Sequence, residues 1–171
     1  MRILLPFIIV MFFFASFFTG SGKHTNSVIN PLSFTESMES DTLLKMERTI
    51  CFGTCPSYTL SILQNGDVTF NGREFVEHKG EATGEISQEN LDVLIQKIRD
   101  SHFMEIPSNP ECESRMTDHP SVFLTIWLAD KQHSITHYQG CKGFQYEKKL
   151  YDLEETIDSL SGAKKWVEGT V

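Results

Sequence analysis

The stretch Ser57–Phe70, SYTLSILQNGDVTF, decides the fold of this 171-residue chain. Apolar residues alternate with serine and threonine from Ser57 to Ile62, which predicts a β-strand with one buried and one solvent-facing side. The pair Asn65-Gly66 follows and predicts a tight hairpin, because both residue types tolerate a positive φ. The return strand runs to Phe70. The chain therefore contains an antiparallel sheet.

Further strands are predicted on both sides of this hairpin. Val122–Ala129 is apolar on both faces, which is typical of an inner strand buried on two sides. A tight turn near Asp130-Lys131 leads into a partner strand, and this register places His137 opposite Leu124. The remaining predicted strands are Leu43–Ile50, Gln132–Tyr138 and, after a turn at Asn71-Gly72, Arg73–His78.

Two amphipathic helices complete the expected fold. Ser87 is a natural N-cap for a helix over Gln88–Ser101, where leucine and isoleucine recur at helical spacing. A second helix with the same periodicity runs from Tyr146 to Leu160 and is ended by Gly162. The order hairpin, helix, hairpin, helix predicts an α+β fold, an antiparallel sheet with both helices packed on one face.

The N-terminus has the pattern of an export signal. Arg2 precedes an apolar run over Ile3–Phe18, which is shorter than the roughly 20 residues that span a bilayer. We expect residues 1–21 to be a signal peptide, cleaved after Ser21, and the protein to be secreted or periplasmic. The alternative is an uncleaved N-terminal membrane anchor. The polar residues 22–42 are interpreted as a flexible leader, and residues 43–168 as a single domain.

The charge balance excludes some classes of partner. The formal net charge is −8, and an acidic chain without a basic stripe repels the phosphate backbone of nucleic acids. The sequence contains neither a glycine-rich phosphate loop nor a Gly-x-Ser-x-Gly nucleophile motif. We therefore expect no nucleic-acid partner, and membrane contact only through the N-terminal segment if it stays uncleaved.

The four cysteines predict the covalent framework. Because cysteines of exported proteins are normally oxidised, Cys51, Cys55, Cys112 and Cys141 are expected to form two disulfides. The predicted hairpin brings Cys141 to the end of the sheet where the loop with Cys112 arrives, and a turn at Gly53 would let Cys51 reach Cys55. Cross-pairing between the two groups remains an alternative.

Two sharper hypotheses use the same cysteines. Thiol redox chemistry at Cys51 and Cys55 is disfavoured, because a strand follows Cys55 where a reactive thiol usually has a helix N-terminus. Zinc could be bound by Cys51, Cys55, His137 and Cys141, with His119 as a substitute ligand. The oxidising compartment argues against this site. We expect neither a cofactor nor a metal.

A second candidate site consists of Asp118, His119, His137 and Tyr138, which carry acid–base chemistry. The predicted register puts His137 several residues along the strand from Asp118, so direct contact is not expected. The favoured interpretation of Asp118 is structural, as a residue that accepts hydrogen bonds from backbone amides in the loop before the strand.

The sheet face away from the helices is a candidate binding face. Phe123 and Trp127 are predicted to lie there among serines and threonines, where an aromatic pair can dock a protein or glycan partner. The alternative is that the leader or the C-terminal Trp166-Val167 segment covers this face. The polar residues expected around the pair are Ser57, Thr59, Ser61 and Thr136.

Four motifs in combination resemble the domain of unknown function family 6438. They are Cys51-Phe52-Gly53-Thr54-Cys55-Pro56-Ser57-Tyr58, Asn65-Gly66-Asp67-Val68-Thr69-Phe70-Asn71-Gly72, Thr117-Asp118-His119-Pro120 and His137-Tyr138-Gln139-Gly140-Cys141. The resemblance covers about residues 43–167 and implies no activity, substrate or cofactor. We expect an exported, disulfide-stabilised, non-enzymatic module that binds a cell-envelope or extracellular partner. The alternative is an envelope metal-binding or thiol-dependent enzyme that uses the Cys/His cluster.

Overall fold

The computed structural model describes residues 41–169 of the chain. The predicted signal peptide, residues 1–21, and residues 22–40 of the predicted leader lie outside this range. The first strand begins at Thr42, which is 2% exposed, so the domain starts one residue earlier than predicted. Within residues 41–169, no helix is both long and apolar enough to cross a bilayer.

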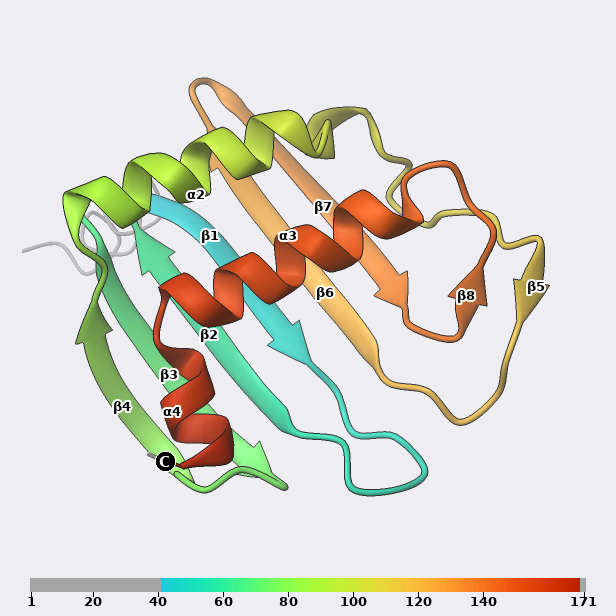
Figure 1. Cartoon of the computed structure of the whole chain (residues 1–171), viewed down its shortest axis with the longest axis horizontal. Helices are drawn as coiled ribbons and strands as arrows, with labels where there is room; N and C mark the ends of the chain where they lie inside the picture. Colours follow the sequence, from blue (N-terminus) through green and yellow to red (C-terminus); the bar gives the residue numbers. More distant parts are fainter. Residues whose placement is uncertain (1–40, 170–171) are drawn as a thin grey trace, which may run out of the picture.

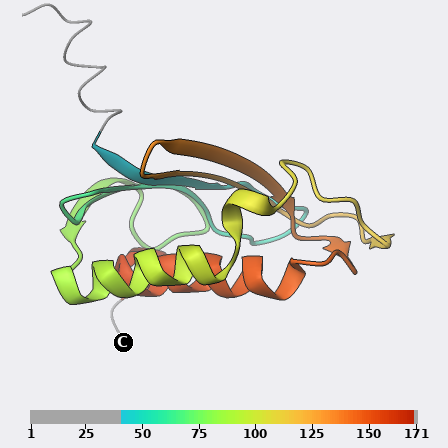
Figure 2. The same cartoon turned by 90° about the horizontal axis from the view of Figure 1, so that it is seen from above.

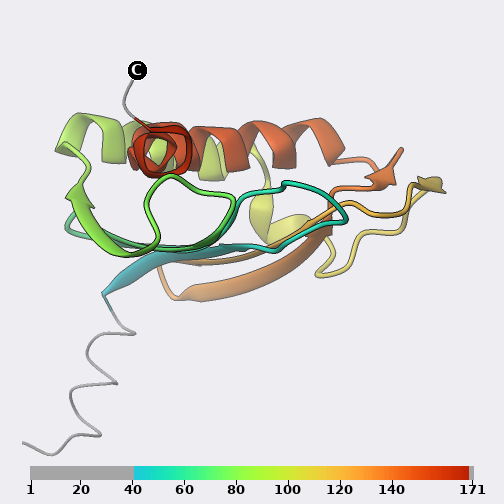
Figure 3. The ribbon, with the colours of Figure 1, turned by 90° about the horizontal axis from the view of Figure 1, so that it is seen from below.

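A six-stranded antiparallel sheet forms one layer and the helices form the other (Figures 1 and 2). The strand order is β4-β3-β2-β1-β6-β7. Within residues 41–169, all helices lie on the same side of the sheet and none lies on the opposite face (Figure 3). The predicted α+β class is confirmed. The strands of this sheet are β1 (Thr42–Arg48), β2 (Ser57–Leu63), β3 (Asp67–Glu74), β4 (Gly80–Glu85), β6 (Ser121–Leu128) and β7 (Lys131–Tyr138).

Two features of the architecture were not expected from the sequence. One is a short second ladder, formed by β5 (Ser114–Arg115) and β8 (Cys141–Lys142). The other is a third α-helix at the C-terminus. The helices are α2 (Gln88–Asp100), α3 (Glu147–Leu160) and α4 (Ala163–Glu168), with a 3-10 turn η1 (Phe103–Glu105) after α2.

The hairpin that decides the fold forms where the sequence predicts it. Gly66 adopts a φ of 95°, and a side chain there would meet the carbonyl oxygen of Ile86 at 2.6 Å. The Asn65 side chain accepts a hydrogen bond from the Asp67 amide at 3.0 Å. β2 and β3 then pair from Ile62↔Val68 outward. The turn residues and the alternation of apolar and polar side chains therefore specify the same hairpin register.

The predicted turn at Asn71-Gly72 is wrong, and so is the predicted strand over Arg73–His78. Asn71 and Gly72 lie inside β3, and the chain reverses direction later, at residues 75–79, before β4. Gly72 serves close packing, because a Cβ there would lie 2.0 Å from the carbonyl oxygen of His78. The glycine therefore marks an approach of two backbones, which the sequence pattern does not distinguish from a turn.

The β6–β7 turn lies one residue earlier than predicted. Leu128 pairs with Lys131, so the turn residues are Ala129 and Asp130, with Ala129 at a φ of 53°. His137 consequently faces Val122 instead of Leu124. The pairing changes by two residues, and this even shift keeps every side chain on its predicted face.

β6 is not buried on both faces, contrary to the prediction. Val122 and Leu124 are at most 1% exposed on the helix side, whereas Phe123 on the other side is 44% exposed. A run that is apolar on both faces is typical of a strand between two layers. Within residues 41–169 helices pack on only one face of the sheet, so no helix of this range covers the second face (Figure 3).

The helices close the core over the inner sheet face. Ser87 caps α2 by accepting from the Asn90 amide at 3.3 Å, and Leu91 and Leu94 are buried. In α4, Trp166 packs on Phe70 with ring centroids 5.1 Å apart. The C-terminal segment therefore folds onto the helix side, and the alternative that it covers the outer face is wrong.

Glu147 in the first turn of α3 offers a test of local electrostatics. Its carboxylate accepts from the Gly143 amide at 2.8 Å and lies 3.2 Å from the Lys142 ammonium. The amide hydrogen bond first, and then Lys142, hold the pKa of Glu147 below its ordinary value. A depressed pKa contributes stability above the ordinary pKa, and this is lost as the pH falls through the folded-state value. NMR titration of the carboxyl groups should show the lowered pKa of Glu147. Glu147→Gln should reduce the loss of stability on acidification in this pH range. A pKa of Glu147 at or above its ordinary value would contradict this explanation.

Candidate functional site

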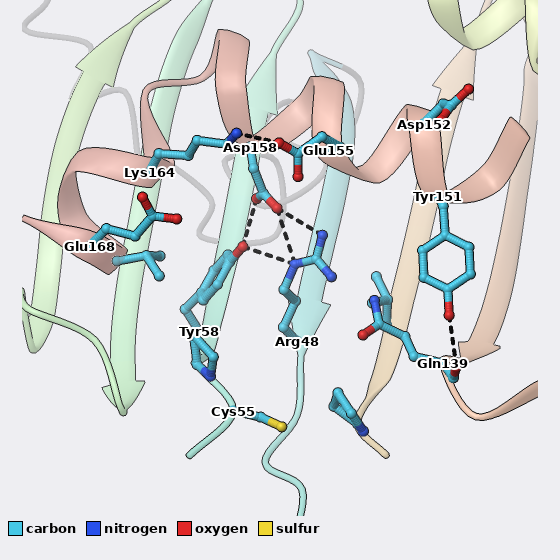
Figure 4. A pocket seen from close by; sticks show the side chains of 14 residues that line it. Arg48, Cys55, Tyr58, Gln139, Tyr151, Asp152, Glu155, Asp158, Lys164 and Glu168 are labelled. Atoms are coloured by element: carbon cyan, nitrogen blue, oxygen red, sulfur yellow. Dashed lines mark hydrogen bonds and ion pairs between the residues drawn. The ribbon is translucent and has the colours of Figure 1, made fainter. Parts of the chain in front are cut away.

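A pocket of about 540 Å³ opens between the cysteine loop and the helices α3 and α4 (Figure 4). Its residues come from β1, β2, β6, the loops beside them and both helices, so only the folded chain assembles it. The volume lies in the range of small-molecule sites. The apolar part of its wall is formed by Pro56, Tyr58, Pro120, Val122, Tyr151 and Val167.

Charged side chains share this pocket with the apolar wall. Four carboxylates and two cations line it, together with Gln139 and Cys55. A few polar groups within a mostly apolar concavity are what fixes the orientation of a ligand. The charged residues are Arg48, Lys164, Asp152, Glu155, Asp158 and Glu168.

Arg48, Asp158 and Tyr58 form a hydrogen-bonded triangle in the pocket (Figure 4). The Arg48 guanidinium donates to Asp158 Oδ2 through Nη2 at 2.7 Å and Nε at 3.2 Å. The Tyr58 hydroxyl donates to Asp158 Oδ1 at 2.6 Å and lies 2.9 Å from Arg48 Nε. Three side chains from β1, β2 and α3 are thereby held in one geometry.

Burial shapes the titration of this triangle. Burial raises the pKa of the Tyr58 hydroxyl, and the Asp158 carboxylate raises it further. Burial also raises the pKa of Asp158, against the opposing effects of Arg48 and Tyr58. Burial alone would lower the pKa of Arg48, but Asp158, Tyr58 and Glu154 together hold it above its usual value. Tyr58 therefore remains a neutral donor and Arg48 a cation at physiological pH.

A second polar layer lies behind Arg48. Glu154 on α3 contacts His137 Nδ1 at 2.6 Å, accepts from Gln139 Nε2 at 3.2 Å and lies 3.6 Å from Arg48 Nη1. His137 and Glu154 are each 1% exposed and neither lines the pocket. Since the carboxylate accepts, the His137 proton of this contact is on Nδ1. These two groups tie α3 to β7 beneath the pocket.

The other ring nitrogen of His137, Nε2, is the buried polar side-chain atom without a hydrogen-bond partner in residues 41–169. The ring packs edge-on against Tyr151 at 4.6 Å and Phe144 at 5.7 Å. The two ring contacts and the hydrogen bond to Glu154 together fix the orientation of the His137 ring.

The structure pairs Cys51 with Cys55 and Cys112 with Cys141, which is the pairing that the sequence favoured. The Cα atoms are 5.6 Å and 5.1 Å apart. No cysteine within residues 41–169 is free. The proposed zinc ligands are therefore not brought together, and the described residues contain no cluster of three or more potential metal ligands.

The candidate residues Asp118 and His119 lie in the loop before β6, and His119 contacts Tyr138 at the end of β7. Asp118 has a φ of 68° and accepts from the Thr117 hydroxyl at 3.0 Å. The His119 amide donates to the Tyr138 hydroxyl at 3.3 Å, and that hydroxyl donates to the carbonyl of Met116 at 2.7 Å. These contacts order a surface loop.

His137 does not join this group. It neighbours Tyr138 in β7, but successive side chains of a strand point to opposite faces. Tyr138 contacts the loop, whereas His137 is buried against α3 and bonded to Glu154. The four residues proposed as one acid–base site are thus divided between two faces of the sheet.

The candidate binding face holds one well-exposed aromatic residue. Phe123 is 44% exposed, and Trp127 is partly buried with the Lys45 ammonium 5.5 Å above its ring. Phe123 lies between Glu47 of β1 and Thr136 of β7. On this face, polar and charged side chains lie next to Phe123.

The disulfide loop presents a second exposed aromatic residue. Phe52 lies between the bonded cysteines Cys51 and Cys55 and is 90% exposed, and Ile50, just before Cys51, is 60% exposed. Because Phe52 is almost fully exposed, Phe52→Ala is expected to change the free energy of unfolding by less than about 0.5 kcal/mol. Urea unfolding measures this. A loss above about 1.5 kcal/mol would show that Phe52 packs against the fold.

The polar residues of the pocket were missed in the sequence. Glu154 and Asp158 lie four residues apart on α3, next to the buried Leu153 and Ile157. Carboxylates beside the apolar positions of an amphipathic helix need a buried partner. The position of these two carboxylates was therefore the signal in the sequence for a buried polar contact. It does not name Arg48 as the partner, because that residue lies 110 positions from Asp158.

The comparisons with known proteins agree with this framework. A comparison with curated proteins finds no match to the chain. A family model described as a domain of unknown function, DUF6438, matches residues 42–161. This span begins at β1 and ends just after α3, so it includes the whole sheet and the Arg48–Asp158–Tyr58 triangle. The chain therefore belongs to the domain of unknown function family DUF6438.

Proposed function

We propose that the protein is an exported, disulfide-stabilised binding module whose ligand site is the pocket between the cysteine loop and α3–α4. The observation that carries this proposal is the Arg48–Asp158–Tyr58 triangle, a set of oriented polar groups inside a mostly apolar cavity. Such convergence of polar groups in an apolar concavity is the usual character of ligand sites. The ligand is a cell-envelope or extracellular molecule.

The energetic cost of the triangle supports a functional role. Buried ion pairs lose most of their Coulombic gain to desolvation, and apolar replacements are often as stable or more stable. The Arg48 and Asp158 side chains are only 16% and 11% exposed. Stability alone does not explain why charges occupy this place, whereas recognition of a polar ligand does.

The covalent framework supports pre-organisation of the site. Cys55 and Pro56 line the pocket, and Cys55 is bonded to Cys51 four residues earlier. A wall that is held in place loses little conformational entropy when a ligand binds. We propose binding instead of catalysis. The buried pair His137–Glu154 does not line the cavity, and the Arg48–Asp158–Tyr58 triangle that does is held in one geometry by its own hydrogen bonds.

The outer sheet face is the competing site for a protein or glycan partner. The 44% exposure of Phe123 favours it. The pocket is the better candidate because it is a cavity that contains oriented polar groups, the usual character of a ligand site. The two sites lie on opposite sides of the sheet, so an experiment that maps binding to residues separates them.

The test uses three probes with the same phenylethyl or phenylpropyl stem and different charge: phenethylamine, 3-phenylpropionate and 2-phenylethanol. Each is titrated into the full-length mature protein and followed by ¹H–¹⁵N NMR. We expect at least one probe to shift the amides of Tyr58, Tyr151 and Val167 saturably. Binding of all three only near Phe123 and Trp127, or no binding, would overturn the proposal.

A matched pair of variants controls this test. Val167→Trp fills the pocket wall and should abolish the shifts, whereas Val93→Trp makes the same change on α2, where the valine is 51% exposed. Thermal unfolding confirms that both variants fold. Equal probe binding by the two variants would place the binding elsewhere.

Export has its own test. The full-length chain is expressed with its own N-terminus, and the product is analysed by N-terminal sequencing and by intact mass with and without reductant. We expect an extracytoplasmic chain that begins at Gly22 and gains four hydrogens on reduction of its two disulfides. A chain that keeps Met1 supports the membrane-anchor alternative, and a cytosolic chain with free thiols contradicts export.

A further inference from the structure

The charge balance of the pocket indicates which ligand it takes. Four carboxylates and two cations line the cavity, so the lining carries an excess of negative charge. Each cation is already committed: Arg48 to Asp158, and Lys164 to Glu155. Neither cation is available to an anionic ligand without breaking its ion pair.

The layer behind the pocket increases this excess. Arg48 Nη1 lies 3.6 Å from Glu154, so the guanidinium faces two buried or half-buried carboxylates at once. The positive charge of Arg48 is therefore fully compensated from within the protein. An incoming carboxylate or phosphate would be repelled by Glu154 and Asp158.

One carboxylate at the rim is not held in an ion pair. Glu168 at the end of α4 forms no hydrogen bond or ion pair within residues 41–169, although its charge acts on Lys164, whose pKa is raised first by the hydrogen bond to Glu155 and also by Glu168. Asp152 pairs with Lys148 on its own helix, and Lys148 does not line the pocket. Figure 4 shows Glu168 and Glu155 on the same side of the cavity as Lys164.

We propose that the pocket binds an organic cation, a primary ammonium or guanidinium group on an apolar stem. The charged head lies at Glu168, beside the Lys164–Glu155 ion pair, and the stem packs on the wall formed by Pro56, Tyr58 and Val167. This inference rests on the proposed function and adds the class of ligand. Such a cation is carried either by a free amine or by a lysine or arginine side chain of a partner.

The affinities of the three phenyl probes test the ligand class at low ionic strength. Phenethylamine is expected to bind about tenfold more tightly than 2-phenylethanol and 3-phenylpropionate, and added salt should reduce this difference. Glu168→Gln should weaken phenethylamine about fivefold. Asp130→Asn removes the same charge from the β6–β7 turn, at the other end of β6 from the pocket residues Pro120 and Val122, and should leave the affinity unchanged.

The possible outcomes separate the two levels of the proposal. If the neutral or anionic probe binds in the pocket as tightly as phenethylamine, the cation inference is overturned and the binding function stands. If no probe reaches the pocket, both are overturned. The same loss of affinity in Glu168→Gln and Asp130→Asn would also overturn the inference, because it would show only a net-charge effect.

A peptide arm identifies the source of the cation. Acetyl-Gly-Lys-Gly-amide presents an ammonium group on an apolar stem within a peptide backbone. Tighter binding than phenethylamine supports a basic side chain of a partner protein, and weaker binding supports a free amine. Failure of both cationic probes, with intact thermal unfolding of the protein, overturns the inference.

Discussion

Arg48→Met is expected to destabilise the protein by about 3–5 kcal/mol, because the change leaves buried carboxylates without their counter-charge. Arg48 is the cation that contacts Asp158 at 2.7 Å and Glu154 at 3.6 Å, and the side chains of these two acids are 11% and 1% exposed. Methionine keeps much of the apolar stem of arginine, so lost packing contributes little. The loss is measured as the free energy of unfolding in urea.

A surface ion pair with the same nitrogen–oxygen distance is the matched control. Arg73 and Glu47 also lie 2.7 Å apart, but their side chains are 43% and 40% exposed. Arg73→Met is therefore expected to cost less than about 1 kcal/mol. Equal losses in Arg48→Met and Arg73→Met would contradict the burial argument.

The double variant Arg48→Met with Asp158→Leu tests whether the loss of stability comes from the unpaired carboxylate. It replaces the charged pair by apolar groups, so most of the lost stability should return, apart from the part that Glu154 retains. A double variant as unstable as the single one would mean that the triangle is required for folding, which would weaken the argument that its charges serve recognition.

The second large effect concerns the longer disulfide. Cys112 and Cys141 are 29 positions apart, whereas Cys51 and Cys55 are four apart. In the loop-entropy model, removing the Cys112–Cys141 bridge by the double substitution Cys112→Ala and Cys141→Ala should lower the free energy of unfolding by about 3–4 kcal/mol. Removing the Cys51–Cys55 bridge in the same way should lower it by about 2 kcal/mol. The longer bridge also joins the segment before β5 to β8.

Unfolding curves of the two double variants, with the native protein in reductant as a reference, check this ranking. The account expects the variant without the Cys112–Cys141 bridge to be the less stable of the two by about 1–2 kcal/mol. The reverse order would show that the Cys51–Cys55 loop stabilises the native state by contacts, beyond its loop length.

Local signals explain which parts of the fold were predictable. Asn65-Gly66 and Ser87 act on neighbouring residues, and the hairpin and helix α2 formed where these residues place them. The pair Asn71-Gly72 has the same chemistry but lies inside β3, because its glycine is needed for a close approach by the chain at His78. Local patterns cannot distinguish these two uses of glycine.

The pocket was not predictable for a different reason. Its triangle joins Arg48 and Tyr58 to Asp158, which lies 100 or more positions along the chain. Sequence spacing carries no information on such contacts. The cysteine pairs were accessible because an exported chain with few cysteines allows few pairings, whereas the partners of a buried carboxylate are not limited in this way.

The most direct test of the binding proposal is where phenethylamine lies on the protein. Intermolecular nuclear Overhauser effects between the probe and the full-length mature protein report this position. The account predicts contacts from the phenyl ring to the side chains of Tyr58, Tyr151 and Val167, which line the pocket. Contacts to Phe123 and Trp127 on the opposite side of the sheet, with none to the pocket, would contradict it.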